Sequence, residues 1–218
     1  MHLVCPLEFE RIALRALARR RRWTLHCCGP GAAGVERWAG ASVIPRGARV
    51  VLAGVAGGLH PDVASGTAVE VVEVCEAGAA PTAPPLRLTG LPAARCLAVG
   101  APLTTLESKR AATELHGADV VDTESAAFAR VATRSRWSWT IVRGVSDGAE
   151  HSLPEGIAAW TDARGKTRLA PVAWAVLRGR ISGGELAALG SRSVKAMKAV
   201  AAALDAADAA DAKERPGR

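Results

Sequence analysis

Short apolar runs alternate along the chain with stretches in which apolar residues recur every three or four positions. The runs are typical of buried β-strands, and the recurring spacing is typical of amphipathic helices. The strand-like runs are residues 2–5, 23–28, 48–58, 67–76, 95–100, 118–122 and 139–147. The predicted helices are residues 6–20, 32–41, 104–116 and 192–213. Because strands alternate with helices, the pattern predicts an α/β fold with helices layered on a mostly parallel sheet.

Other stretches refine this prediction. Residues 48–58, "ARVVLAGVAGG", are almost continuously apolar, which is typical of a central strand covered on both faces. Residues 77–90 predict a surface loop. Residues 153–190 predict helical pieces broken at Pro154, Gly165, Pro171 and Gly183–Gly184. We expect one domain over residues 1–205, followed by a helix end and a frayed tail over residues 206–218.

The composition narrows the class of protein. The chain has 218 residues, of which 49% are hydrophobic, so it can bury a sizeable core. No run approaches about 18 uncharged apolar residues, so no transmembrane segment is expected, while peripheral contact with a membrane stays open. The five cysteines form no CxxC pair, which indicates buried thiols in the reducing cytoplasm. No His, Cys, Asp or Glu cluster has metal-ligand spacing, so neither a metal nor a cofactor is expected.

Positive charge is the other compositional feature. The formal net charge is +7, and its densest cluster is "RALARRRRW", residues 15–23. Such a cluster can bind nucleic acid or anionic lipid. Aromatic residues make up only 4% of the chain, and no nucleic-acid-binding module is recognisable. We therefore interpret the cluster as a solvated helix end and expect no nucleic-acid partner.

The first predicted helix carries an acid on its apolar side. Its polar stripe runs through positions 8, 11, 15 and 19, whereas Glu10 aligns with Leu14 and Leu17. Glu10 should therefore point inward, where a carboxylate has either a raised pKa or a hydrogen-bonded role. Such a group suits activation of a water or a hydroxyl. The alternative is a carboxylate that caps a neighbouring loop or favours the positive end of its own helix.

A second acid lies on the apolar side of a predicted helix in "VVDTESAAFARVATR", residues 120–134. Glu124 shares a helical stripe with Ala127, Phe128 and Val131. One interpretation is an N-terminal helix cap, which Asp122, Thr123 or Ser125 could complete. The other is that Glu124 accepts hydrogen bonds from ligand hydroxyls, because the two oxygens of a carboxylate match a vicinal diol such as that of ribose.

Two further features lie at strand ends. Asp147 follows the last predicted strand in "VSDGAE", which is either plain turn chemistry or a position for a general acid. The segment "GPGAAG", residues 29–34, formally fits GxGxxG, but no acid follows the next strand at residues 53–58, so we reject a dinucleotide site. Its glycines still permit a close backbone approach, and their amides can hold an anion or a ligand oxygen.

The order and spacing of five segments resemble the nucleoside phosphorylase/nucleosidase superfamily. They are "CPLEFE", "GPG", "AGVAGGLHPDVASGTAVEV", "VVDTESAAFARVA" and "TIVRGVSDGAE", within about residues 2–155. The later "LPEGIAAWTDARGKTRL" and the C-terminal helix most resemble the hopanoid-associated phosphorylase branch. The resemblance implies a three-layer α/β/α sandwich with a mixed, mostly parallel central sheet. It also implies a cytoplasmic homo-oligomer without a cofactor.

The activity that the resemblance implies is cleavage of a purine N-glycosidic bond, with phosphate or water as the acceptor. Asp147 would protonate the purine at N7, a role that requires a protonated acid near neutral pH. Glu124 would hold the ribose hydroxyls, and Glu10 would orient the attacking water or contact the ribose. Ser146 would steady Asp147.

The resemblance also places backbone and apolar groups beside the substrate. Gly57 and Gly58 would let the ligand approach the sheet, and Gly29 and Gly31 belong to the matched "GPG" element. Thr123 stands where the family usually has Met beside the ribose.

Two other departures concern the acceptor and the base. Val55 stands where many members carry Ser or Thr, which removes a phosphate or water ligand. Residues 100–109 lack the aromatic that usually stacks on the base. The resemblance to the hopanoid-associated branch implies an adenosyl nucleoside as the partner, with a hydrophobic 5′ substituent such as that of adenosylhopane. The alternatives are a methylthioadenosine/S-adenosylhomocysteine-type nucleosidase and a catalytically silent nucleoside-binding protein.

Overall fold

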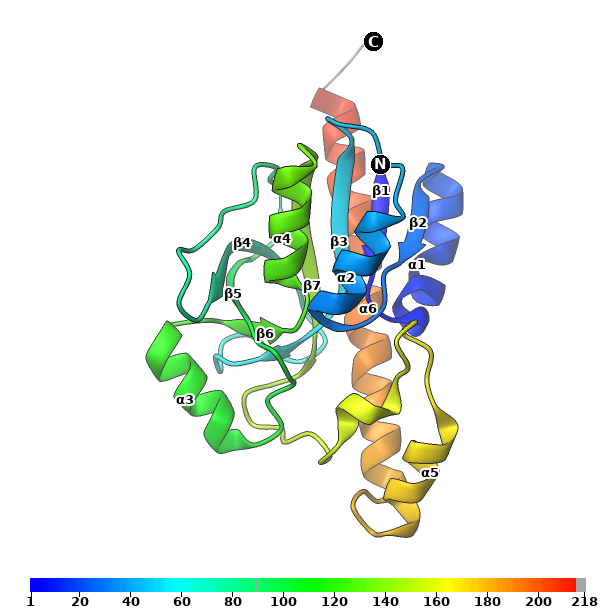
Figure 1. Ribbon diagram of the computed structural model, residues 1–218, viewed down its shortest axis with the longest axis vertical. Helices are drawn as coiled ribbons and strands as arrows, with labels where there is room; N and C mark the ends of the chain where they lie inside the picture. The colour runs from blue at the N-terminus through cyan, green and yellow to red at the C-terminus, as the bar shows by residue number, and fades with distance from the viewer. Residues whose placement is uncertain (89, 215–218) are drawn as a thin grey trace.

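The computed structural model describes residues 1–88 and 90–214 (Figure 1). Seven strands form one sheet in the order β2-β1-β3-β6-β5-β4-β7. The strands are β1 (His2–Cys5), β2 (Thr24–Cys27), β3 (Arg49–Gly58), β4 (Ala68–Glu76), β5 (Ala93–Ala98), β6 (Val120–Asp122) and β7 (Ser138–Asp147). Each overlaps a predicted strand, so the expected α/β element order is confirmed.

The sheet is mixed and mostly parallel, as expected. The antiparallel pairings are β3–β6 and β4–β7, and all the other pairings are parallel. Strand β7 pairs with β3 as well as with β4, so β3, β6, β5, β4 and β7 close into a ring instead of an open sheet. This closure places the carboxyl ends of the parallel strands β3 and β7 side by side.

Helices cover both faces of the sheet (Figure 1). They are α1 (Glu8–Arg21), α2 (Gly31–Gly40), α3 (Leu106–His116), α4 (Ser125–Arg134), α5 (Leu169–Leu177) and α6 (Gly183–Glu214), with a 3-10 helix η1 (Ile157–Trp160). Because successive side chains of a strand point to opposite faces, β3 contributes to two cores. Val50 and Leu52 pack with Phe128 of α4, whereas Val51 packs with Leu14 of α1 and Met197 of α6. The predicted layers are therefore present.

The last helix begins earlier than predicted. Residues 183–190 were expected to hold a break at Gly183–Gly184, yet α6 starts at Gly183. A reciprocal cap explains the difference: the Glu185 N–H donates to Ser182 Oγ at 3.1 Å, and the Ser182 N–H donates to Glu185 Oε2 at 2.8 Å. This Ser-x-x-Glu pattern stabilises a helix start that the glycines alone would disfavour. The predicted frayed tail lies, from residue 215 onward, outside the described residues.

Two expectations from composition have structural counterparts. All five cysteines are free; four are buried, and Cys27 is only partly buried, beside the Pro6 carbonyl. None of the described helices combines the length and apolarity needed to cross a membrane.

Candidate active site

A cavity of about 710 Å³ lies where β3, β6 and β7 end. Helix α1, η1 and the first part of α6 complete its wall. Ligands of α/β folds commonly bind beyond the carboxyl ends of parallel strands, and this cavity lies at those ends of β3 and β7. Eight of the predicted site residues line it: Glu10, Gly31, Val55, Gly57, Thr123, Glu124, Ser146 and Asp147.

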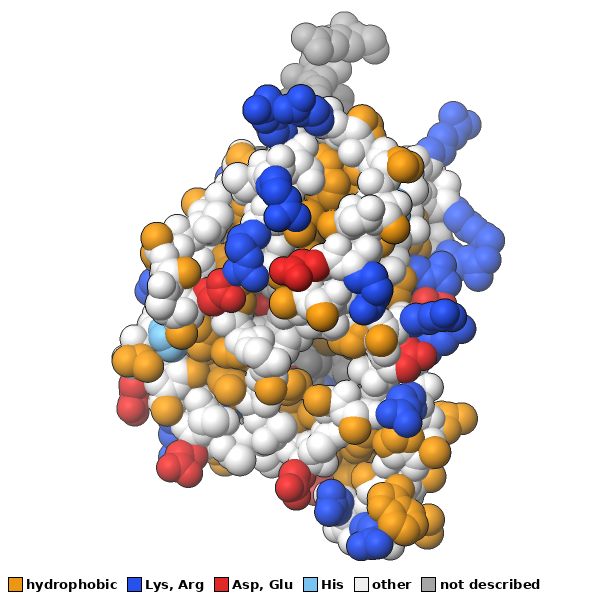
Figure 2. Space-filling model, in the orientation of Figure 1, with side chains coloured by type: hydrophobic (Ala, Val, Ile, Leu, Met, Phe, Trp, Pro, Cys, Tyr) orange, Lys and Arg blue, Asp and Glu red, His pale blue; other side chains and the backbone are white. Residues whose placement is uncertain are grey.

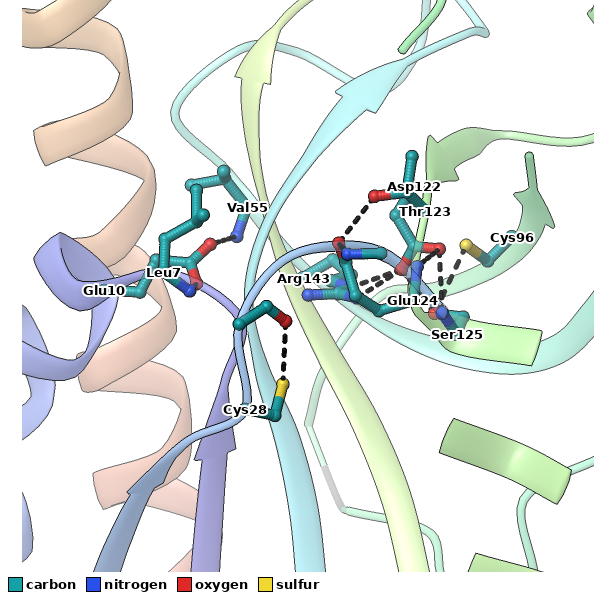
Figure 3. Close-up of polar contacts among 12 residues, drawn as sticks. Leu7, Glu10, Cys28, Val55, Cys96, Asp122, Thr123, Glu124, Ser125 and Arg143 are labelled. Atoms are coloured by element: carbon teal, nitrogen blue, oxygen red, sulfur yellow. Dashed lines mark hydrogen bonds and ion pairs between the residues drawn. The ribbon is translucent and has the colours of Figure 1, made fainter. Parts of the chain in front are cut away.

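Glu10 enters the cavity from the first turn of α1 and is 1% exposed. Its Oε2 accepts the Leu7 N–H at 2.7 Å, and its Oε1 accepts the Val55 N–H at 2.7 Å (Figure 3). The first of these bonds fixes Leu7 as the cap, so α1 begins at Glu8 and not at Pro6 as predicted. Burial raises the pKa of Glu10 to about 8, although the charge of Arg143 and the two amides favour the ionised form.

Arg143 is the cation at the centre of this region. It lies in β7 and is fully buried, and its Nε donates to Asp122 Oδ2 at 2.7 Å. Its Nη2 also approaches Glu124 Oε2, at 3.4 Å. Figure 3 shows the guanidinium between Glu10 on one side and the Asp122–Glu124 segment on the other. Gly54 pairs with Arg143 across the β3–β7 ladder. A side chain at Gly54 would therefore collide with the Arg143 guanidinium and with the Glu10 carboxylate.

Glu124 stands at the N-terminus of α4, but its side chain does not cap the helix. Asp122 does so instead, because its Oδ1 accepts the Ser125 N–H at 3.0 Å. Glu124 Oε1 accepts the Gly31 N–H at 2.7 Å and the Thr123 hydroxyl at 2.5 Å. The helix-start amide in "GPGAAG" therefore binds a carboxylate of the protein itself. Burial raises the pKa of Glu124, while Arg143 opposes this shift.

Asp147 and Ser146 both line the cavity because β7 contains a bulge. Val145 pairs with Ala56 and Asp147 pairs with Gly57, so Ser146 is an extra residue in the ladder. Without a bulge, consecutive strand residues point to opposite faces. Ser146 Oγ donates to Asp147 Oδ1 at 2.7 Å, which holds the carboxylate in place.

A buried lysine pairs with Asp147. Lys109 Nζ on α3 donates to Asp147 Oδ2 at 2.6 Å and to the Gly148 carbonyl at 2.8 Å. The two side chains are 1% and 3% exposed. The resemblance called for a protonated Asp147. The structure instead pairs its carboxylate with the Lys109 ammonium in a buried ion pair.

Gly29 and Gly58, which the resemblance placed beside the substrate, do not line the cavity. Gly58 points to the opposite side of β3 from Gly57, and a side chain there would meet Val145 and the Val63 carbonyl. Gly29 adopts φ of +85°, and its missing side chain would overlap the Ala163 carbonyl. Both glycines serve close packing away from the cavity.

The end of the cavity formed by η1 and α6 is mostly apolar. Residues that precede α6, or belong to it, supply this wall: Leu153, Ile157, Trp160, Leu186, Leu189 and Val194. Among the described residues that line the cavity, no Arg, Lys or His occurs, and the charged side chains are all acids: Glu10, Asp122, Glu124 and Asp147. No described group of His, Cys, Asp and Glu is arranged to hold a metal ion.

Several residues of this site were missed by reasoning from the sequence. Lys109, like Glu10, is a charged residue on the buried side of its helix, which it shares with Ala112. That side of α3 has few large apolar residues, so the sequence pattern does not reveal that it is buried. Arg143 interrupts an apolar strand, which is a visible signal in the sequence. Phe9 and Trp160 bring to the cavity the aromatic rings that residues 100–109 lack.

Comparison with known proteins identifies solved structures that share this fold. No protein-family profile matches the chain, and a search of curated proteins finds no match. Among solved structures, futalosine hydrolase of Helicobacter pylori matches with a TM-score of 0.69 and 11% identity, over 96% of this chain and 97% of that chain.

Two nucleosidase structures match over similar lengths. The 5′-methylthioadenosine/S-adenosylhomocysteine nucleosidase (MTAN) of H. pylori has a TM-score of 0.68 and 10% identity, over 96% and 97% of the two chains. A Chlamydia trachomatis MTAN bound to MTA has a TM-score of 0.65 and 14% identity, over 96% and 97%. The chain therefore has the fold of these hydrolases and nucleosidases, as the resemblance predicted.

Proposed function

We propose that the protein hydrolyses the N-glycosidic bond of an adenine nucleoside that carries a bulky hydrophobic 5′ substituent. The observation that carries this proposal is the meeting of Glu10, Glu124 and Asp147 in one cavity that has a mostly apolar end at η1 and α6. Two of these acids belong to helix starts and the third to a strand end, so a single cap or turn does not account for all three. The structural neighbours named as a hydrolase and nucleosidases support the same class of reaction.

Water is the acceptor in this proposal. A phosphate ion needs cationic or amide partners, yet the charged side chains that line the cavity are acids. An anion placed among them would be repelled at short range. Glu10 is suited to activate water because its pKa of about 8 makes its ionised form a base of useful strength near neutral pH. We expect kcat/KM to rise with pH up to about 8 as Glu10 loses its proton.

The Lys109–Asp147 pair would supply the proton that the leaving base needs. As the bond between C1′ and N9 breaks, its electron pair passes to the adenine. Lys109 passes a proton to Asp147 across their 2.6 Å contact, and N7 takes that proton from Asp147. The carboxylate is then ionised again, and the neutral Lys109 is reprotonated from solvent. Water adds to C1′ and gives its own proton to Glu10. Glu124 would accept the ribose hydroxyls through Oε2, since Oε1 already holds two donors.

The apolar wall suggests the 5′ substituent. Leu186 and Leu189 belong to the apolar end of the cavity, where a hydrophobic chain or ring system would be desolvated on binding. Adenosylhopane is such a nucleoside, and its use would place the protein in the hopanoid-associated branch. Methylthioadenosine carries a far smaller 5′ group and would leave most of this wall uncovered.

The experiment measures adenine release from adenosylhopane, adenosine and methylthioadenosine, each with and without phosphate. We expect the fastest release from adenosylhopane, no stimulation by phosphate, and free ribose derivative as the second product. A requirement for phosphate would contradict the choice of water. Tight adenine binding without turnover of any substrate would instead indicate a catalytically silent nucleoside-binding protein.

A further inference from the structure

Helix α5 presents apolar side chains to the solvent. Leu169 is 77% exposed, Trp174 56% and Leu177 80%. In Figure 2, hydrophobic and basic side chains gather together at the end of the molecule where Figure 1 draws α5. A solvent-facing cluster that contains a tryptophan is typical of a surface that binds a partner.

The opposite side of the same helix is already packed. Ala175 forms a small core with Trp160 and Ile181, and Val172 and Leu186 pack against this core. Trp160 and Leu186 also line the apolar end of the cavity. Helix α5 is therefore one layer removed from the cavity, and its exposed side is not part of the protein's own core.

The flanks of α5 are strongly basic. Residues 163–180 contain five basic residues and no acid; they are Arg164, Lys166, Arg168, Arg178 and Arg180. Among the described residues, none of the five forms an ion pair. The guanidinium of Arg178 lies 4.4 Å from the centre of the Trp174 ring. Asp162 lies near Arg164 and Lys166, but it is a single acid beside five basic residues. The surface thus combines an apolar centre with an excess of positive charge.

The densest basic cluster in the sequence differs in this respect. Arg20 and Arg21 form ion pairs with Asp205 of α6, and Arg21 also pairs with Asp208. Two of the five arginines of residues 15–23 are therefore ion-paired within the molecule, whereas none of the five basic residues around α5 forms a described ion pair.

We infer that α5 and its basic flanks bind the surface of a membrane that contains anionic lipids. In this arrangement Leu169, Trp174 and Leu177 enter the headgroup region, and the arginines contact lipid phosphates. An interfacial helix has this combination of one apolar face, a tryptophan and flanking basic residues. The inference does not depend on the proposed hydrolysis, since it uses a surface outside the cavity.

Two other partners fit the surface less well. A twofold dimer through α5 would bring the five basic residues of one copy against the same five of the other, which is repulsive. A nucleic acid would match the charge but would leave Leu169 and Leu177 without an apolar partner. An anionic lipid surface satisfies both properties.

The experiment uses the full chain with two kinds of vesicle, phosphatidylcholine alone and phosphatidylcholine mixed with phosphatidylglycerol. We expect sedimentation with the mixed vesicles only, weakened by added salt. Trp174 fluorescence should shift to the blue and be quenched by brominated lipid, because Trp174 is the one exposed tryptophan of the six. Each basic residue removed should lower the partition constant by about fivefold.

Variants separate the surface from the rest of the protein. The double variant Leu169→Ser, Leu177→Ser and the double variant Arg178→Gln, Arg180→Gln should each lose most of the binding. The control Leu115→Ser changes a residue on α3 that is 78% exposed, and its binding should match that of the wild type. Binding to neither kind of vesicle, equal binding of all variants, or self-association abolished by Leu169→Ser, Leu177→Ser would each overturn the inference.

Discussion

The two ends of the cavity differ in the kind of contact that their side chains make. At the polar end, each carboxylate has named partners at short distance: two amides for Glu10, a hydroxyl and an amide for Glu124, and a hydroxyl and an ammonium for Asp147. At the other end, apolar side chains such as Leu186 and Leu189 present area without directional contacts.

This difference indicates which step of the proposed reaction each end of the cavity determines. Hydrogen bonds and ion pairs are directional, and a buried charge that loses its partner costs several kcal/mol. Apolar contact is non-directional and scales with the area buried. The polar end should therefore determine whether a bond is cleaved, and the apolar end should determine which 5′ substituent is preferred.

The largest expected effect comes from Asp147→Asn. An amide cannot supply the proton for the leaving base, so kcat should fall by about 10²- to 10⁴-fold, the usual contribution of a general acid. Adenine binding, measured by calorimetry, should be largely kept. The matched control is Asp62→Asn, because the Asp62 side chain is 90% exposed. If Asp147→Asn and Asp62→Asn turn over substrate equally fast, Asp147 is not the acid.

Glu10→Gln should change how stability depends on pH. Between the ordinary value of 4.5 and its folded pKa of about 8, Glu10 binds a proton in the folded protein that the unfolded chain releases. Wild-type stability from this group therefore falls as the pH rises through that window. Glutamine does not ionise, so the free energy of unfolding of the variant should rise relative to that of the wild type, by up to about 5 kcal/mol at pH 8.

Urea unfolding at several pH values measures this difference, and Glu8→Gln on the polar stripe of the same helix is the control. The pKa of Glu8 is lowered by its hydrogen bond from Arg11, so its variant should show no gain toward pH 8. A pH-independent difference for Glu10→Gln would mean that Glu10 is ionised throughout the window.

Lys109→Met should lower the release of adenine by about 10²-fold, because Asp147 loses its proton supply. Hydrolysis of a 4-nitrophenyl riboside with the same 5′ substituent should change far less, since nitrophenolate leaves without being protonated. A purely structural lysine would affect both substrates alike. Lys198→Met, an exposed position on α6, serves as the control.

The smallest effect is expected at the apolar end. Leu189→Ala removes part of the wall and should lower kcat/KM for adenosylhopane by about tenfold. The value for adenosine should stay the same, because adenosine does not reach this wall. Leu115→Ala, far from the cavity lining, is the control. An equal loss for both nucleosides would contradict the division of labour between the two ends.

Much of the fold could be predicted from local sequence patterns. The predicted strands overlap β1 to β7 because the period of apolar residues is a property of each segment alone. The same reasoning singled out Glu10 and Glu124, since an acid on an apolar stripe is visible without knowing its partner. The Ser182-x-x-Glu185 cap was equally local, and it went unnoticed beside two glycines.

What the sequence determined by itself is therefore the set of elements and the acids that break their patterns. Only the tertiary structure decided the partners: Lys109 meets Asp147 across 38 residues, and Gly31 meets Glu124 across 93. It also decided that Gly57, but not Gly58, lines the cavity, and that β7 closes against β3. Burial, ion pairing and cavity shape depend on atoms that are distant in the chain, and no local pattern records those distances.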